Sequence, residues 1–392
     1  MQVRHLSLTN FRNYEHAEIE FAADTTAIVG RNGQGKTNIV ESLWYLNALT
    51  SHRITQDQAM IRRNEENPPQ SAIIRVRVHI ENRDITVEVE LNRSSPNRAQ
   101  VNGTPIKMRE LPHYFSAVLF APEDLWTVRG EPAVRRRFVD QLLVQRNPRY
   151  RAVIADYERI LKQRNALLKS ARAAKLKDTQ LGTLDIWDER LITAGSLLID
   201  ARTELITALS QPLTQAYSRL AGEDHFPRLI PQLTIMGAQT DDETASVSFP
   251  SGTAVGETET AQVFGRALRA VRPLERERGV TLLGPHRDDV LFELNKLPTK
   301  GYASHGESWS FALALKLASA ELLRRESRVG DPVVILDDVF AELDRERRLR
   351  LAEALADYEQ VLITAAIPED VPPMMARNTL HVQAGVVTGR SE

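Results

Sequence analysis

The chain has 392 residues, enough for two or three domains, and 42% of them are hydrophobic, which suffices to bury a core. Its 50 Lys and Arg residues against 52 Asp and Glu give a formal net charge of -2, which excludes a uniformly basic coat for nucleic acid. It has no Cys, so disulfides, thiolate catalysis and Cys-ligated zinc are excluded together.

The first residues, MQVRHLSLTNFRNYEH, lack the continuous apolar core of a secretory signal. No later segment has the roughly 18 uninterrupted apolar residues that a membrane span needs. We therefore expect a globular cytoplasmic protein with no membrane partner.

The first predicted strand, TTAIV, leads through a glycine-rich loop into a helix that begins TNIVESLWYL. Residues 30–37 match G-x-x-x-x-G-K-[ST] in the strand-to-helix setting that this phosphate-binding motif requires. Backbone N–H groups would surround the phosphates, Lys36 would add a charge, and the Thr37 hydroxyl could hold Mg²⁺. The alternative is a glycine-rich turn without a ligand. The predicted nucleotide-binding residues are Gly30, Arg31, Asn32, Gly33, Gln34, Gly35, Lys36, Thr37 and Asn38.

The next elements are strands. Apolar residues alternate strictly from 74 to 80 and from 85 to 91, which predicts two paired strands with charged residues on their outer faces. Asn102-Gly103 predicts a further tight hairpin.

Three consecutive arginines, Arg135, Arg136 and Arg137, could contact DNA phosphates. The alternative is a solvated helix face with salt bridges. From about 150 to 220 the apolar period is helical, but Arg164 occupies a position that should be apolar, which favours a compact helical lobe over a long coiled coil. Residues 236–262 are rich in Gly, Ser, Thr and acids, which predicts a loop.

Two later segments carry polar groups suited to a phosphate site. SHGESW opens an apolar helix: Ser304-x-x-Glu307 is a capping box, and a helix start with Ser304 and Gly306 is also an anion site. VVILDD predicts a buried parallel strand that ends at Asp337, where α/β ligand sites lie. Asp337 would bind Mg²⁺, and Asp338 would either orient the attacking water or cap a turn.

In this order, the motifs resemble the ATP-binding-cassette head that transporters, Rad50 and the structural-maintenance-of-chromosomes proteins share. LTNFRNYEHAEIEF, FAPEDLWTVRGEPAVRRRFVD and LLGPHRDD further resemble the RecF family of bacterial recombination mediators, over nearly the whole chain. The resemblance implies an α/β fold, with a mixed sheet, a P-loop and an inserted compact helical lobe. We expect head segments at 1–145 and 263–392 and the lobe with its loop at 146–262.

The resemblance also implies a function. It implies ATP and Mg²⁺ as cofactors, a nucleotide contact by Arg12 and Asn13, and an ATP-dependent homodimer in which Ser304 acts on nucleotide held by the second copy. The catalytic residues would be Lys36, Asp338 and Ser304. The partners would be DNA at gaps or single-strand/double-strand junctions, together with RecR and RecO in loading recombinase, with links to replication and the SOS response. Asp338 and Thr364 stand where transporters carry Glu and His, which favours slow hydrolysis used as a switch.

Other functions remain open at this point. One is the nucleotide-binding subunit of a membrane transporter, and another is an ATP-gated interaction module without significant turnover. A GTPase or small-molecule kinase is disfavoured, because Asn295-Lys296-Leu297-Pro298 lacks the guanine-reading Asp of NKxD.

Overall fold

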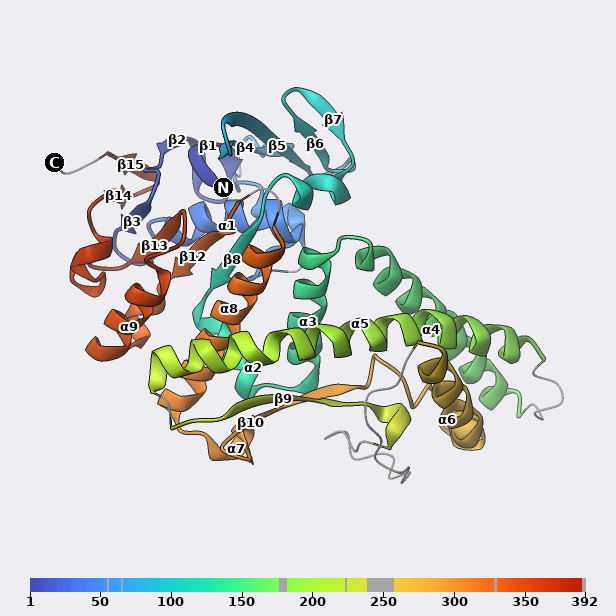
Figure 1. Cartoon of the computed structure of the whole chain (residues 1–392). Coiled ribbons are helices and arrows are strands. Elements are labelled where there is room, and N and C mark those ends of the chain that lie inside the picture. Colours follow the sequence, from blue (N-terminus) through green and yellow to red (C-terminus); the bar gives the residue numbers. More distant parts are fainter. Residues whose placement is uncertain are drawn as a thin grey trace. The chain divides into compact units, whose positions relative to one another are not determined.

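The structure is a computed structural model that describes residues 1–54, 56–64, 66–175, 182–222, 224–237, 257–327 and 330–389 (Figure 1). The chain forms two compact units. Unit 1 comprises Met1–Leu125, Pro212–His225 and Trp309–Glu392, and unit 2 comprises Trp126–Gln211 and Phe226–Ser308. These limits differ from the divisions expected at 145 and 262, which stay predictions of where domains begin and end.

Unit 1 contains an antiparallel sheet of six strands. Apolar alternation buries Ile74, Val76 and Val78 and exposes Arg75 and Arg77, which confirms the predicted strand pair. Arg75 pairs with Glu88 on the neighbouring strand, and Asn102 begins the predicted hairpin turn. The strand order is β2 (Tyr14–Glu20), β1 (Gln2–Phe11), β4 (Ser71–Ile80), β5 (Arg83–Asn92), β6 (Arg98–Val101) and β7 (Thr104–Ile106).

The second sheet of unit 1 positions the candidate site. It runs β15 (Val386–Thr388), β14 (Thr379–Gln383), β3 (Thr25–Val29), β13 (Val361–Ala365), β12 (Val333–Asp337) and β8 (Ala117–Phe120), and only β15 is antiparallel to its neighbour. Strands β12 and β13 are buried along their whole length, as continuous apolar runs in parallel sheets are. Because β3, β13 and β12 are parallel, their carboxyl ends lie at one edge of the sheet.

Helix α1 (Lys36–Ala48) belongs to the same hydrophobic core as both sheets, since Leu43 of α1 shares a cluster with Val76 of β4 and Ile335 of β12. Unit 1 also contains α9 (Arg345–Leu355), the part of α8 (His305–Glu326) that follows Ser308, and the last turns of α5 (Gly182–Ala221) from Pro212 onward. Single 3₁₀ turns lie at η1 (Asp57–Met60), η2 (Met108–His113), η3 (Pro122–Asp124), η6 (Val339–Glu342), η7 (Pro368–Asp370) and η8 (Pro373–Met375).

Unit 2 is mainly helical, which confirms the helical periodicity, although it also contains a small antiparallel sheet that the sequence did not predict. Its helices are α2 (Leu125–Arg129), α3 (Pro132–Arg146), α4 (Tyr150–Ala173), α6 (Glu257–Arg278) and α7 (Thr299–Tyr302), together with the part of α5 (Gly182–Ala221) that ends at Gln211. The sheet joins β9 (Pro227–Gln232), β10 (Asp289–Leu294) and β11 (Leu297–Pro298), and η5 (Thr234–Met236) follows β9.

The loop predicted at 236–262 is wrong at its end, because α6 already begins at Glu257. The acidic and threonine residues 257–260 are helical there, and residues 238–256 lie outside the described part of the chain.

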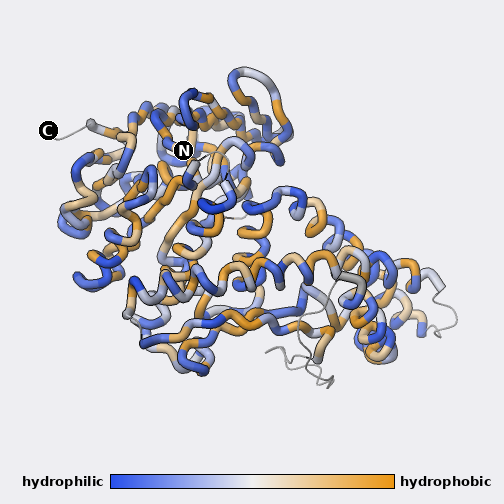
Figure 2. Tube along the Cα trace, in the orientation of Figure 1, coloured by the Kyte–Doolittle hydropathy of each residue, from blue (hydrophilic) through white to orange (hydrophobic). Residues whose placement is uncertain are grey.

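Hydrophobic and hydrophilic bands alternate along the 40 residues of α5 (Figure 2). Within the described ranges, no helix combines the length and the apolarity of a membrane span.

Arg164 explains why the apolar period of α4 is interrupted. Its side chain is fully buried and donates to Asp188 (2.7 Å), to Glu275 (2.6 Å) and to the hydroxyl of Thr281 (2.8 Å). The charge therefore joins α4, α5 and α6 where an apolar residue would otherwise pack.

Candidate nucleotide site

Two glycines of the loop between β3 and α1 have no room for a side chain. A Cβ on Gly30 would lie 2.2 Å from the carbonyl oxygen of Val382, and one on Gly35 would lie 2.6 Å from Nδ2 of Asn13. Gly35 also has a φ of 114°, a conformation that favours glycine. The structure thus places the motif between strand and helix as expected, with Arg31, Asn32 and Gly33 exposed.

Lys36 is the first residue of α1 and is only 3% exposed. Its Nζ lies 3.4 Å from both the carbonyl oxygen of Arg31 and Oδ1 of Asn32. These contacts are long for hydrogen bonds, so the ammonium group is held by its own loop only weakly. A phosphate oxygen, which forms a stronger charge-assisted bond, could replace them.

Asp337 ends β12 next to the beginning of α1. Its Oδ1 accepts from Oγ1 of Thr37 at 3.1 Å and from Oγ1 of Thr364 at 2.7 Å. The two motifs that lie 300 residues apart in sequence are thus joined by a direct hydrogen bond. A hydroxyl and a carboxylate beside phosphate-binding N–H groups form a donor set suited to Mg²⁺ shared with phosphates. Among the described residues, no group of three His, Cys, Asp or Glu forms a separate metal site.

Asp338 has a left-handed backbone, with φ 52°, and its N–H donates to Oγ1 of Thr364 at 2.9 Å. Its side chain makes no capping bond, contrary to the alternative that it caps the following turn, and its buried Oδ1 has no hydrogen-bond partner. Burial raises the pKa of this carboxyl group, while the charge of Lys36 acts in the opposite direction. The arrangement holds a carboxyl group beside Lys36 with an oxygen free to accept.

Asn13 contacts the loop, whereas Arg12 contacts the helix that follows it. Arg12 gives a two-fold hydrogen bond to the fully buried Glu41, at 2.7 and 2.5 Å, and a third bond to the carbonyl of Ala59. Asn13 donates to the carbonyl of Gln34 at 3.2 Å and accepts from Asn38 at 2.7 Å. Arg12 therefore acts through Glu41 in this structure, and its predicted nucleotide contact stays a prediction.

Gln34 also ties the loop to the end of the sheet. Its side-chain oxygen accepts from the N–H of Ala384, and its carbonyl accepts from the N–H of Gly385. The loop is thus anchored on one side by Asn13 and on the other by the turn after β14.

Ser304 and Gly306 belong to unit 2. The predicted capping box is present: Ser304 N–H donates to Glu307 Oε2 at 2.7 Å, and Glu307 N–H donates to Ser304 Oγ at 3.2 Å. Ser304 and His305 are exposed at the start of α8. The sequence did not identify Arg129, whose side chain contacts Ser308 at 3.1 Å and His305 at 3.4 Å and so supports this helix start.

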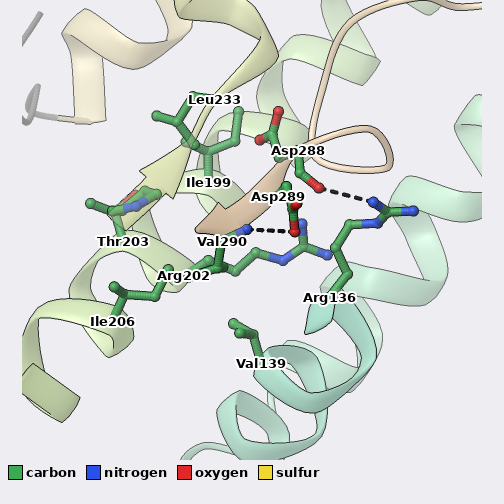
Figure 3. A pocket seen from close by; sticks show the side chains of 11 residues that line it. Arg136, Val139, Ile199, Arg202, Thr203, Ile206, Leu233, Asp288, Asp289 and Val290 are labelled. Carbon is green, nitrogen blue, oxygen red and sulfur yellow. Dashed lines mark hydrogen bonds between the residues drawn. The ribbon is translucent and has the colours of Figure 1, made fainter. Parts of the chain in front are cut away.

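The three arginines of α3 differ sharply in environment. Arg135 is 5% exposed and forms two bonds of 2.7 Å with Asp289, so its guanidinium is occupied inside unit 2. Arg136 donates to the carbonyl of Asp288 at 2.9 Å (Figure 3). Only Arg137 of the three is exposed. Arg135 thus has a salt bridge, as the alternative predicted, but it is buried and not solvated, and the DNA contact stays a prediction.

Asp288, next to this ion pair, is almost fully buried. Its Oδ1 accepts from the N–H and the hydroxyl of Thr234 at 2.8 and 2.7 Å, while its Oδ2 has no partner among the protein atoms. Burial raises the pKa of this carboxyl group. Asp288 lines a cavity of about 20 Å³ with Arg136 and Arg202, enough for one water molecule (Figure 3).

His52 was missed by sequence reasoning. It follows α1, and its Nε2 lies 3.8 Å from Oδ2 of Asp337. No spacing rule connects this position to the aspartate strand. The only signal is the polar segment Ser51-His52-Arg53 directly after an apolar helix.

The chain matches the family RecF/RecN/SMC N terminal domain over residues 2–385. A protein of Leifsonia xyli subsp. xyli, named DNA replication and repair protein RecF, is 64% identical over 387 residues, which cover 99% of each chain. A protein of the same name from Clavibacter michiganensis subsp. michiganensis is 58% identical over 390 residues, 99% of this chain and 96% of that one.

Two solved structures show the same fold. The recombination mediator protein RecF-ATPrS in the RecFOR pathway has a TM-score of 0.85 at 24% identity and covers 99% of this chain and 98% of that one. An SMC head bound to the C-winged helix domain of ScpA has a TM-score of 0.56 at 15% identity, with 100% and 98% covered. The predicted fold class, an ATP-binding-cassette-type head, is thereby confirmed.

Proposed function

This chain belongs to the RecF family of DNA replication and repair proteins, and on that premise we propose that it is an ATP-dependent, dimerising DNA-binding protein with slow ATPase activity. It would act at single-strand gaps and single-strand/double-strand junctions. The observation that carries the proposal is the hydrogen bond between Thr37 and Asp337, which joins the phosphate loop to the aspartate strand.

The loop and the start of α1 would hold the phosphates of ATP. Backbone N–H groups at a helix start favour anions, and Lys36 would exchange its long contacts with Arg31 and Asn32 for phosphate oxygens. Thr37 and Asp337 would hold Mg²⁺, which, when bound, neutralises charge on the phosphates.

Asp338 would position the attacking water. Its unpartnered Oδ1 can accept a hydrogen bond from that water, and burial raises the pKa of this carboxyl group. Lys36 lies close enough to stabilise the carboxylate. A site that is short of partners without nucleotide is consistent with slow turnover and with use as a switch.

The dimer would be completed by Ser304. The capping box fixes an exposed hydroxyl at the N-terminus of α8, where the helix dipole favours negative charge. If the γ-phosphate held by Lys36 is bound by Ser304 of a second copy, ATP stabilises the closed dimer and ADP does not. Hydrolysis would then release the dimer.

DNA is the proposed macromolecular partner, with RecR and RecO as protein partners in loading recombinase and the cytoplasm as the place of action. This extends to the chain what the RecF name and the RecFOR pathway describe for relatives. With a net charge of -2, the DNA contact must be a local surface, and Arg137 is the candidate among the three arginines of α3.

The test is DNA binding to gapped and blunt duplexes with ATP, with ADP and without nucleotide. We expect binding that needs ATP, prefers the gapped duplex and weakens steeply with salt. Equal affinity in all three nucleotide states would contradict the switch. ATP-dependent binding without phosphate release would instead favour an interaction module that binds ATP without turning it over.

A further inference from the structure

His52 is a largely buried histidine whose two ring nitrogens are buried without a hydrogen bond. Its side chain is 11% exposed, and neither Nδ1 nor Nε2 has a hydrogen-bond partner. Buried polar side chains in folded proteins are nearly always satisfied, so an unsatisfied one needs an explanation. Its Nε2 lies 3.8 Å from Oδ2 of Asp337, the carboxylate that also accepts from Thr37.

A buried histidine in unit 2 shows what a structural role looks like. His286 forms a bond of 2.7 Å with the hydroxyl of Tyr157 through Nδ1, and Nε2 lies 3.4 Å from the carbonyl of Thr281. Both of its ring nitrogens are therefore used within the fold. His52 has neither kind of hydrogen bond, and its Nε2 approaches Asp337 only to 3.8 Å.

The segment that carries His52 is nevertheless held firmly. The N–H groups of Arg53 and Ile54 donate to Oγ of Ser51 at 3.0 and 3.2 Å, and that hydroxyl donates to Glu41. Glu41 is in turn bound by Arg12. The backbone on both sides of the ring is thus fixed to α1, and the ring is not placed by chance at a loose turn.

A second buried group beside the same aspartate also lacks a partner. Oδ1 of Asp338 is unpartnered, and its carboxyl group interacts with Lys36 and Asp337. His52 and Asp338 therefore flank Asp337 with hydrogen-bonding capacity that the protein itself does not use. Both groups lie by Asp337, at the carboxyl end of β12, where the phosphate loop and the aspartate strand meet.

We propose that His52 is a catalytic residue of the nucleotide site, whose ring N–H donates a hydrogen bond to the terminal phosphate of ATP. This rests on the proposed function, because it assigns a contact within the same site. ADP lacks that phosphate, so His52 distinguishes ATP from ADP. Arg12, Glu41 and Ser51 act as positioning residues, because they hold the segment that presents the ring.

The test compares His52→Ala, His52→Gln and the control His113→Ala, which removes an exposed histidine of η2. Calorimetric titration with ATP and with ADP in Mg²⁺ gives the affinities, and thermal unfolding without nucleotide gives the stability. We expect His52→Ala to weaken ATP binding by about 10- to 100-fold, the value of a hydrogen bond to a charged group, and ADP binding by less than about 3-fold.

Two further results are expected. The melting temperature of His52→Ala without nucleotide is not lowered, because an unsatisfied buried group has been removed. His52→Gln, whose amide can donate, recovers at least part of the lost ATP affinity. The control binds both nucleotides like wild type.

Other outcomes overturn the proposal. Equal losses for ATP and ADP would show that His52 acts on the shared phosphates or on Mg²⁺, and a lowered melting temperature with unchanged affinities would show a structural role. If wild type binds ATP normally and His52→Ala does too, this inference fails while the proposed function stands. If wild type binds no ATP, the proposed function itself fails.

Discussion

In unit 2, the buried guanidinium of Arg164 meets two carboxylates and a hydroxyl, whereas beside the phosphate loop of unit 1 both ring nitrogens of His52 and Oδ1 of Asp338 meet no hydrogen-bond partner. Both regions bury polar groups, and burial carries a penalty unless the groups are paired. The network of Arg164 joins helices of unit 2, although Oδ2 of Asp288 in the same unit has no partner among the protein atoms. In unit 1 the missing pairing marks the place where a ligand is expected.

The same contrast separates two sets of arginines. Arg135 is paired with Asp289, and Arg12 with Glu41, yet only the second pair includes a residue of α1, the helix that follows the phosphate loop. A satisfied buried charge therefore says little about function by itself. A residue that supports the nucleotide site differs from one that only stabilises the fold in where it lies relative to unsatisfied polar groups.

The largest effect is expected in unit 2, for Arg164→Ala. The change leaves the fully buried Glu275 without its partner, and breaking a buried pair costs about 3–5 kcal/mol. Chemical denaturation would measure this loss, while ATP affinity in unit 1 should not change. Arg159→Ala, which removes an exposed partner of Asp156, is the matched control and should have little effect. Equal losses for both variants would contradict the structural role of the network.

Asp338→Asn tests the unpartnered carboxyl group of unit 1. We expect turnover to fall by about 100-fold or more, because the group that orients the water loses its basic oxygen. The melting temperature without nucleotide should not fall, because burial already disfavours the charged form of this carboxyl group. Phosphate release and thermal unfolding measure the two effects. Unchanged phosphate release would remove Asp338 from the mechanism.

The pH dependence of stability tests His286. Burial lowers its pKa from 6.5 to about 3, so the unfolded chain binds a proton more readily than the fold does. The contribution of His286 to the free energy of unfolding is fully present above about pH 6.5. It falls as the pH decreases and is lost entirely only near pH 3. At pH 4.5 the loss is about 2–3 kcal/mol.

Urea denaturation of wild type and His286→Gln between pH 4.5 and 7.5 isolates this effect, because the glutamine does not titrate. The raised pKa of Asp288 acts in the opposite direction in both proteins and cancels in the comparison. We expect the stability advantage of wild type to shrink as pH falls. Parallel curves would contradict the buried neutral state of His286.

The smallest effect is expected for Arg137→Ala. Loss of one exposed cation should weaken DNA binding a few-fold and reduce the slope of log affinity against log salt by about one. Titration of a gapped duplex at several salt concentrations measures both. A slope equal to that of wild type would show that Arg137 does not contact a phosphate.

The sequence predicted what depends on local pattern. Gly30 to Thr37, the buried run that ends at Asp337, the hairpin around 80–85 and the capping box at Ser304 each need only neighbouring residues, and the structure has all of them. The burial of Arg135 was not predictable in this way, because its partner Asp289 is 154 residues away. A run of three arginines looks the same whether its members are solvated or paired.

Two other features were hidden for physical reasons. Strand β9, PRLIPQ, has two prolines and no clean alternation, so the small sheet of unit 2 had no local signature. The significance of His52 depends on Asp337, which the fold brings to 3.8 Å from the Nε2 atom of its ring. Both features depend on tertiary contacts, which neither the hydrophobic period nor the motif spacing of the sequence can show.

Our central claim is that Ser304 of a second copy completes the site that holds the nucleotide at Lys36. Light scattering of the wild-type chain and of Ser304→Arg, each with Mg·ATP, with ADP and without nucleotide, tests this claim most directly. The account predicts twice the mass of one chain for wild type with ATP alone, and a single-chain mass for Ser304→Arg although it still binds ATP. A wild-type mass that never changes with ATP would contradict it.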